Sequence, residues 1–108
     1  MPRKKCLRYI ANNPGVSYYK PAGVPMKKLQ EVVLSLDEFE AIRLADAEGL
    51  YHLDAAKKMK ISRQTFGRVI SSARKNVAKA LIAGHAIKIE GGNVDIKKIF
   101  DTNSNIPN

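Results

Sequence analysis

Residues 62–75 contain the side chains whose types and spacing could do chemistry. In a helix, a rotation of ~100° per residue aligns four polar side chains opposite Phe66, namely Gln64, Arg68, Ser71 and Lys75. Arg can bridge two acceptors of guanine, and Gln can pair with two atoms of adenine. Ser and Thr hydroxyls and Lys side chains can hold phosphates. This stretch therefore predicts recognition of a nucleic acid.

The positions within this stretch suggest separate roles. In a helix-turn-helix, the start of the second helix lies deepest in the major groove. We therefore expect one set to make base or near-base contacts: Arg63, Gln64, Thr65 and Arg68. A second set would hold the sugar-phosphate backbone: Ser62, Ser71, Ser72 and Lys75. The simpler alternative is the solvated face of an amphipathic helix, which explains most charge runs.

The charge distribution favours the binding interpretation. Residues 1–30 hold seven Lys or Arg and residues 57–83 hold eight, with no acid in either segment. Residues 31–56 instead hold seven acids and one Arg. A net charge of +9 would be weak support alone, because many soluble domains are basic. Blocks of positive charge are expected of a phosphate-binding face. The N-terminal block is either a minor-groove arm, formed by Arg3, Lys4 and Lys5, or a solubilising terminus.

Helix signals surround the polar stretch. Ser35 and Glu38 have the spacing of a capping box, which predicts a helix from there to Gly49. A short helix over 53–59 and a turn at Lys60 follow. Ser62 is a good N-cap for a long helix that ends at Gly84. Its apolar stripe runs from Phe66 to Leu81.

The rest of the chain predicts shorter elements. Residues 6–11 suit an extended piece, and residues 26–34 suit either a helix or a strand. The alternating residues 86–90 predict a strand, which could pair with an N-terminal extended piece. We expect three parts: a basic N-terminal segment (1–34), a DNA-binding domain (35–92) and a flexible tail (93–108).

Several function classes have little support in the sequence. No apolar run approaches the ~20 residues of a membrane span, and no secretory signal is visible, so we expect a cytoplasmic protein. One cysteine allows no internal disulfide, and Cys6, His52 and His85 are too scattered to predict a metal site. Because no catalytic set or phosphate loop is present, we expect neither an enzyme nor a cofactor.

At this point a resemblance can be stated. Residues 37–81 resemble region four of bacterial sigma factors in five matching places: Glu40 to Leu44, Glu48-Gly49-Leu50, Ala55-Ala56, Ile61-Ser62 and Ala73-Arg74. Four further motifs resemble a family of small prokaryotic predicted DNA-binding proteins: residues 18–23, 31–34, 62–66 and 89–92. The resemblance implies a mainly α fold of the helix-turn-helix, winged-helix-like class, with a short N-terminal extended segment and a short C-terminal strand.

Two residues depart from the sigma-like pattern. Lys60 stands where such turns commonly have Gly, so it would have to adopt a left-handed conformation. His52 stands where the middle helix would usually carry a Ser or Thr cap. Gly67 lies inside the long helix and has two possible explanations. Either DNA or a neighbouring helix approaches closely at this position, or the helix simply tolerates a glycine there.

The best-supported expectation is sequence-specific binding of double-stranded DNA, with regulation of transcription. A homodimer is plausible, because one small module contacts few base pairs. Two alternatives remain. One is a protein-interaction module that docks on RNA polymerase or another regulator through the acidic segment 31–56, and the other is an RNA-binding protein.

Overall fold

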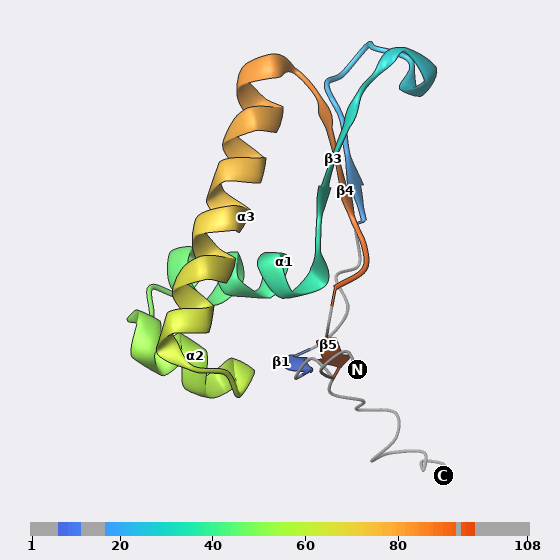
Figure 1. Ribbon diagram of the computed structural model, residues 1–108. Coiled ribbons are helices and arrows are strands. Elements are labelled where there is room, and N and C mark those ends of the chain that lie inside the picture. Colours follow the sequence, from blue (N-terminus) through green and yellow to red (C-terminus); the bar gives the residue numbers. More distant parts are fainter. Residues whose placement is uncertain (1–6, 12–16, 93, 97–108) are drawn as a thin grey trace, which may run out of the picture.

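A computed structural model describes residues 7–11, 17–92 and 94–96, and these residues form three α-helices and two small β-sheets. About half of the described residues are helical (Figure 1). Within this part of the chain, no helix combines the length and apolar character needed to cross a membrane. The proposed arm of Arg3, Lys4 and Lys5 lies outside the described residues.

The first helix, α1 (Leu36–Ile42), begins with the predicted capping box. Ser35 Oγ accepts a hydrogen bond from the Glu38 N–H, and Glu38 Oε1 accepts one from the Ser35 N–H at 2.9 Å. The helix then widens into a π-helical turn, η2 (Arg43–Ala47), that the sequence did not predict. Because this turn aligns residues five apart, it brings Glu48 beside Arg43, with Nη1 and Oε2 2.9 Å apart.

The second helix, α2 (His52–Met59), begins one residue earlier than predicted. Its N-cap is Tyr51, which makes no side-chain capping bond, so His52 is the first helical residue and not the cap. The His52 ring instead meets the ring of buried Phe66 edge-on, with 5.2 Å between centroids. Lys60 ends the helix with φ at 59°, which confirms the left-handed turn.

The long helix, α3 (Arg63–Ala83), has the predicted ends. Ser62 Oγ accepts from the Thr65 N–H at 3.0 Å, and Gly84 closes the helix with φ at 71°. Such a cap stabilises a helix by about 1 kcal/mol. The predicted stripe is buried at five positions, namely Phe66, Val69, Ile70, Ala73 and Ala80. Leu81 does not belong to it, because 73% of its surface is exposed.

The sheet resolves what the sequence left open. Residues 26–34 contain a 3-10 turn, η1 (Met26–Lys28), followed by a strand, β3 (Glu31–Leu34). The predicted strand β4 (Ala86–Ile89) lies in the middle of the order β2-β4-β3. It pairs antiparallel with β2 (Tyr18–Tyr19), an N-terminal extended piece outside residues 6–11, and parallel with β3.

The segment predicted to be a tail contains a strand. Residues 94–96, β5 (Val94–Ile96), pair in parallel with β1 (Arg8–Ile10), which falls in the predicted extended piece. Only three residues form β5, too few for the alternation that identifies a strand in a sequence. Residues 97–108 lie outside the described part.

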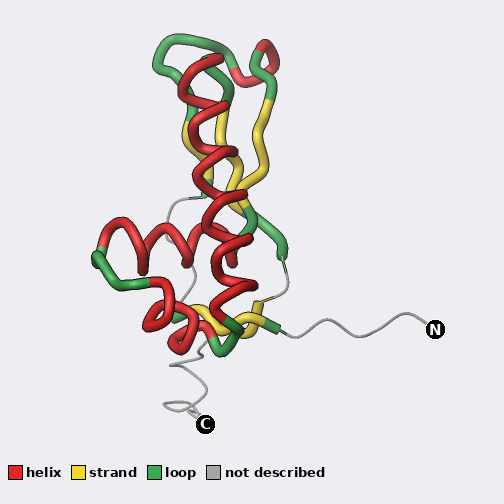
Figure 2. The backbone as a smooth tube through the Cα atoms, turned by 60° about the vertical axis from the view of Figure 1, so that its left-hand side comes forward, coloured by secondary structure: helices red, strands yellow, loops and turns green. Residues whose placement is uncertain are grey.

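The core forms in two places along α3. Around its N-terminal half, α1 and α2 contribute to a cluster that includes Leu44, Met59 and Phe66. Farther along, Ala73 and Val77 pack on Leu34 and Ile89 of the sheet. Figure 2 shows the two shorter helices gathered at one end of α3, near the β1–β5 pair, and the three-stranded sheet beside its other end. The two halves of α3 therefore pack against different parts of the molecule.

Candidate nucleic-acid interface

Six of the eight predicted contact residues have exposed side chains on the first two-thirds of α3: Arg63, Gln64, Arg68, Ser71, Ser72 and Lys75. Together with Gly67, they line a shallow groove of about 670 Å³. None of the seven lining residues is acidic. The structure thus brings the predicted set together on one surface, which is positively charged and rich in hydrogen-bond donors.

The core holds this surface in place. Phe66 and Ile70 point to the opposite side of α3 and are almost completely buried. Their burial fixes the rotation of the helix about its axis, and so the direction in which the groove residues point. Helix residues are held more precisely than loop residues, which suits a recognition surface.

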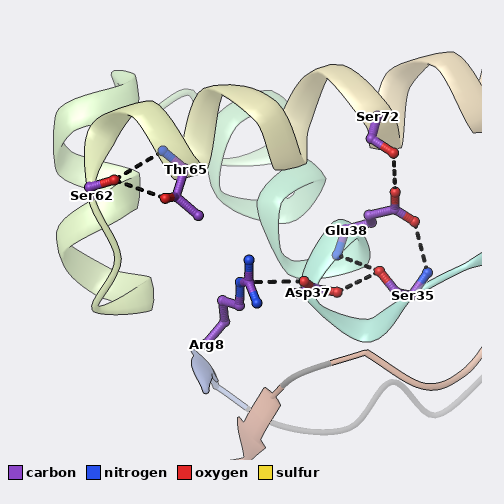
Figure 3. Close-up of polar contacts among 7 residues, drawn as sticks. All are labelled: Arg8, Ser35, Asp37, Glu38, Ser62, Thr65 and Ser72. Carbon is purple, nitrogen blue, oxygen red and sulfur yellow. Dashed lines mark hydrogen bonds and ion pairs between the residues drawn. The ribbon is translucent and has the colours of Figure 1, made fainter. Parts of the chain in front are cut away.

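Ser62 and Thr65 are engaged at the start of the helix (Figure 3). The Ser62 hydroxyl accepts from the Thr65 N–H and donates to Thr65 Oγ1 at 2.9 Å. Thr65 is also half-buried, at the edge of the exposed surface. These two residues therefore shape the first turn, and contacts from them to a nucleic acid remain a prediction.

Ser72 faces the acidic helix as well as the groove. Its hydroxyl donates to Glu38 Oε2, and the Asn76 amide donates to the same carboxylate, as Figure 3 shows for Ser72. The same Glu38 side chain also closes the capping box of α1. Ser72 thus joins α3 to α1, a link that helical spacing alone could not reveal.

The carboxylates of residues 31–56 are largely occupied by internal contacts. Glu40, 4% exposed, accepts two hydrogen bonds from Arg43, at 2.8 and 2.9 Å. This contact raises the pKa of Arg43. Asp46 accepts from Arg74, with 2.6 Å between Oδ1 and Nη2. That hydrogen bond lowers the pKa of Asp46 and raises the pKa of Arg74.

Another ion pair anchors the start of α1 to the N-terminal strand. Arg8 Nε lies 3.7 Å from Asp37 Oδ2, and the Asp37 side chain also accepts a hydrogen bond from Ser35 (Figure 3). Gly92 passes close by, because a Cβ there would lie 2.6 Å from Asp37 Oδ1. This close approach gives the second glycine of the 89–92 motif a structural role.

Gly67 has no neighbour that requires a glycine. A Cβ built at this position meets nothing within 4 Å, so close packing of another helix does not explain it. Its place among the groove residues leaves two explanations, close approach of a ligand and simple tolerance.

Tyr51 is an exposed aromatic residue that the sequence did not indicate as part of the interface. Its side chain is 81% exposed and lines a pocket next to Arg63, together with Leu53 and Arg74. No periodic pattern in the sequence singled out this residue.

No group of three or more His, Cys, Asp or Glu suited to a metal occurs among residues 7–11, 17–92 and 94–96.

The fold and the groove define a class: a small protein with three helices and a small mixed sheet, whose longest helix carries a basic outer surface. Residues 1–97 match a family described as a protein of unknown function, DUF134. The chain belongs to this family, which confirms the resemblance to an uncharacterised prokaryotic family.

Similar proteins occur in several bacteria. A UPF0251 protein of Chlorobaculum tepidum is 61% identical over 81% of this chain, and the match covers 57% of that protein, little more than half of its length. A UPF0251 protein of Thermoanaerobacter pseudethanolicus is 53% identical over 86% of this chain and 79% of its own. One of Caldanaerobacter subterraneus is 49% identical over 89% and 81%. No solved structure gives a significant match.

Proposed function

We propose that the protein binds double-stranded DNA through a helix-turn-helix formed by α2 and α3, and that it regulates transcription. The observation that carries the proposal is the acid-free groove on the outer surface of α3, lined by two Arg, one Lys and one Gln. Three residues, 60–62, separate the two helices, a length typical of this motif. The N-terminal half of α3 is the part that would enter the major groove.

The positions of the side chains along α3 suggest different contacts with DNA. Gln64 and Arg68 lie one turn apart on the exposed surface, where both can reach base edges. Lys75 lies two turns beyond Arg68, so it would meet the phosphate backbone. Specificity would then come from the first turns of α3, and affinity largely from neutralised phosphates.

The acidic segment supports this choice over docking on RNA polymerase. Its carboxylates at Glu38, Glu40 and Asp46 accept hydrogen bonds within the molecule. A docking surface would need them free, and breaking these contacts would carry a cost. No feature of the described residues favours RNA over DNA as the ligand. The experiment below distinguishes the two.

Binding selection from a random duplex pool at two salt concentrations tests the proposal. We expect one enriched sequence motif, with affinity that falls as salt rises. Structured RNA at matched salt is the control, and its preference over duplex DNA would contradict the proposal.

Two variants test the roles of the side chains. Arg68→Ala should reduce discrimination between the selected motif and random DNA, by a factor that corresponds to ~1–3 kcal/mol. Lys75→Ala should weaken binding to both DNAs alike and reduce the salt slope by about one unit. Equal loss on both DNAs in both variants would contradict the assignment of base contacts to Arg68.

A further inference from the structure

A second groove lies between the C-terminal half of α3 and the edge strand β3. It has a volume of about 530 Å³, and its apolar lining comes from Val32, Ala78, Ile82 and Ala83. It is distinct from the groove proposed to bind DNA, although Lys75 borders both. No pattern in the sequence indicated this surface.

The groove has an unusually exposed apolar side chain on its helix side. Ile82, in the last turn of α3, is 86% exposed. Burial of such a side chain is favourable, and an exposed apolar patch beside an apolar groove marks an interaction surface.

The two rims of the groove carry opposite charges. Lys75 and Lys79 lie on the helix rim, and Glu31 lies on the strand rim. Glu31 accepts one exposed hydrogen bond, from the Tyr18 hydroxyl to Oε2, and an ion pair with a lysine does not require this bond to break.

Two copies of one chain can face each other at such a groove in two symmetric ways. The two-fold axis runs either across the groove, from rim to rim, or along the groove, parallel to α3. An axis across the groove would set the lysine rims against each other, which is repulsive. An axis along the groove sets each lysine rim against the glutamate rim of the other copy, which is attractive.

We propose that a second copy of this chain occupies the groove, with a two-fold axis along it. In this isologous dimer, Ile82 of each copy fills the apolar groove of the other. Lys79 of each copy faces Glu31 of the second copy. The charge complementarity of the rims is the observation that selects this occupant over an unrelated protein.

The direction of the axis has a consequence that rests on the proposed function. Because the axis runs along α3, both N-terminal halves of this helix lie at the same end of the dimer. Two-fold related DNA half-sites need two recognition segments placed in this way. The preferred DNA should therefore be a palindrome.

Sedimentation of the full chain without DNA tests the dimer. We expect the wild type to dimerise and Ile82→Glu to raise the dimer dissociation constant at least tenfold. The matched control is Leu81→Glu: Leu81 is 73% exposed, lies in the same helical turn and borders a different pocket, next to β2. Both variants place an acid at the same helix end, so their effects on the helix dipole are similar. The control should stay within about threefold of the wild type, and circular dichroism should show both folded.

A charge exchange tests the direction of the axis. Lys79→Glu and Glu31→Lys should each weaken the dimer, and the double variant should recover most of the wild-type affinity. A double variant as weak as the single ones would overturn the axis along the groove.

Other outcomes would overturn the dimer itself. A wild type that stays monomeric at roughly 100 µM would do so, and would leave the groove to residues 97–108 or to another protein. Equal effects of Ile82→Glu and Leu81→Glu would do the same. These measurements contain no DNA, so failure of the dimer and failure of DNA binding are separate results.

Discussion

At the scale of single residues, Gly67 shows a conflict between stability and the proposed function. A glycine inside a helix costs about 1 kcal/mol relative to alanine. Nothing in the described molecule compensates this cost, because a Cβ at Gly67 would meet no atom within 4 Å. The position lines the groove that we propose to contact DNA. Under the proposed function, close approach of a DNA strand would explain the missing side chain, and simple tolerance of glycine is the alternative.

Gly67→Ala should therefore stabilise the protein and weaken DNA binding. We expect the free energy of unfolding in urea to rise by about 0.5–1 kcal/mol. DNA affinity, measured by fluorescence anisotropy at fixed salt, should fall. Ser71→Ala is the matched control, because it changes an exposed residue of the same groove without adding bulk. A more stable Gly67→Ala protein with unchanged DNA affinity would show that no ligand approaches this position.

At the scale of elements, the N-terminal turn of α3 combines two tasks. Ser62 caps the helix, and the turn that it stabilises carries Arg63 and Gln64 into the groove. Loss of the cap would unwind the residues proposed to contact bases. The two tasks can be separated, because Asp is also a good N-cap residue but is negatively charged.

Ser62→Ala and Ser62→Asp should therefore differ in a diagnostic way. Ser62→Ala should lower the free energy of unfolding by ~1 kcal/mol, with some loss of DNA affinity as the turn frays. Ser62→Asp should keep most of the stability and lose more DNA affinity, because its carboxylate lies where phosphates would approach. Urea unfolding and anisotropy measure the two effects. If Ser62→Asp bound DNA as tightly as the wild type, the start of α3 would not face DNA.

The elements also show which features of the structure can be predicted from neighbouring residues in the sequence. The caps at Ser35 and Ser62, the left-handed Lys60 and the end at Gly84 were predictable, because each depends on a few neighbouring residues. The groove residues were predictable as a set, because helical periodicity places them together. The π-helical turn at Arg43–Ala47 and the strand β5 were not, because contacts across many residues and strand pairing decide them. For the same reason the Ser72–Glu38 bond and the groove at Ile82 were missed.

At the scale of the whole molecule, the acidic segment holds the basic elements together. Asp46 of η2 pairs with Arg74 of α3, and Asp37 of α1 pairs with Arg8 of β1. These ion pairs join elements that would otherwise meet mainly through apolar contacts. With a net charge of +9, the molecule also repels itself, and this repulsion grows as carboxylates become protonated. Acid should therefore destabilise the fold through both effects.

The contribution of one ion pair to this acid sensitivity can be measured with Asp46 and Arg74. The Arg74 hydrogen bond holds the pKa of Asp46 below its ordinary value of 3.8. A carboxyl whose pKa is lower in the folded state adds stability above about pH 4, and this stability is lost as pH falls through the folded pKa. Both side chains are more than a third exposed, so we expect a coupling below about 1 kcal/mol at pH 7. A double-mutant cycle with Asp46→Asn and Arg74→Gln, followed by urea unfolding from pH 7 to pH 2, measures it. The coupling should persist to about pH 4 and then vanish. A coupling that stayed constant down to pH 2 would show that the pair acts through packing and not through charge.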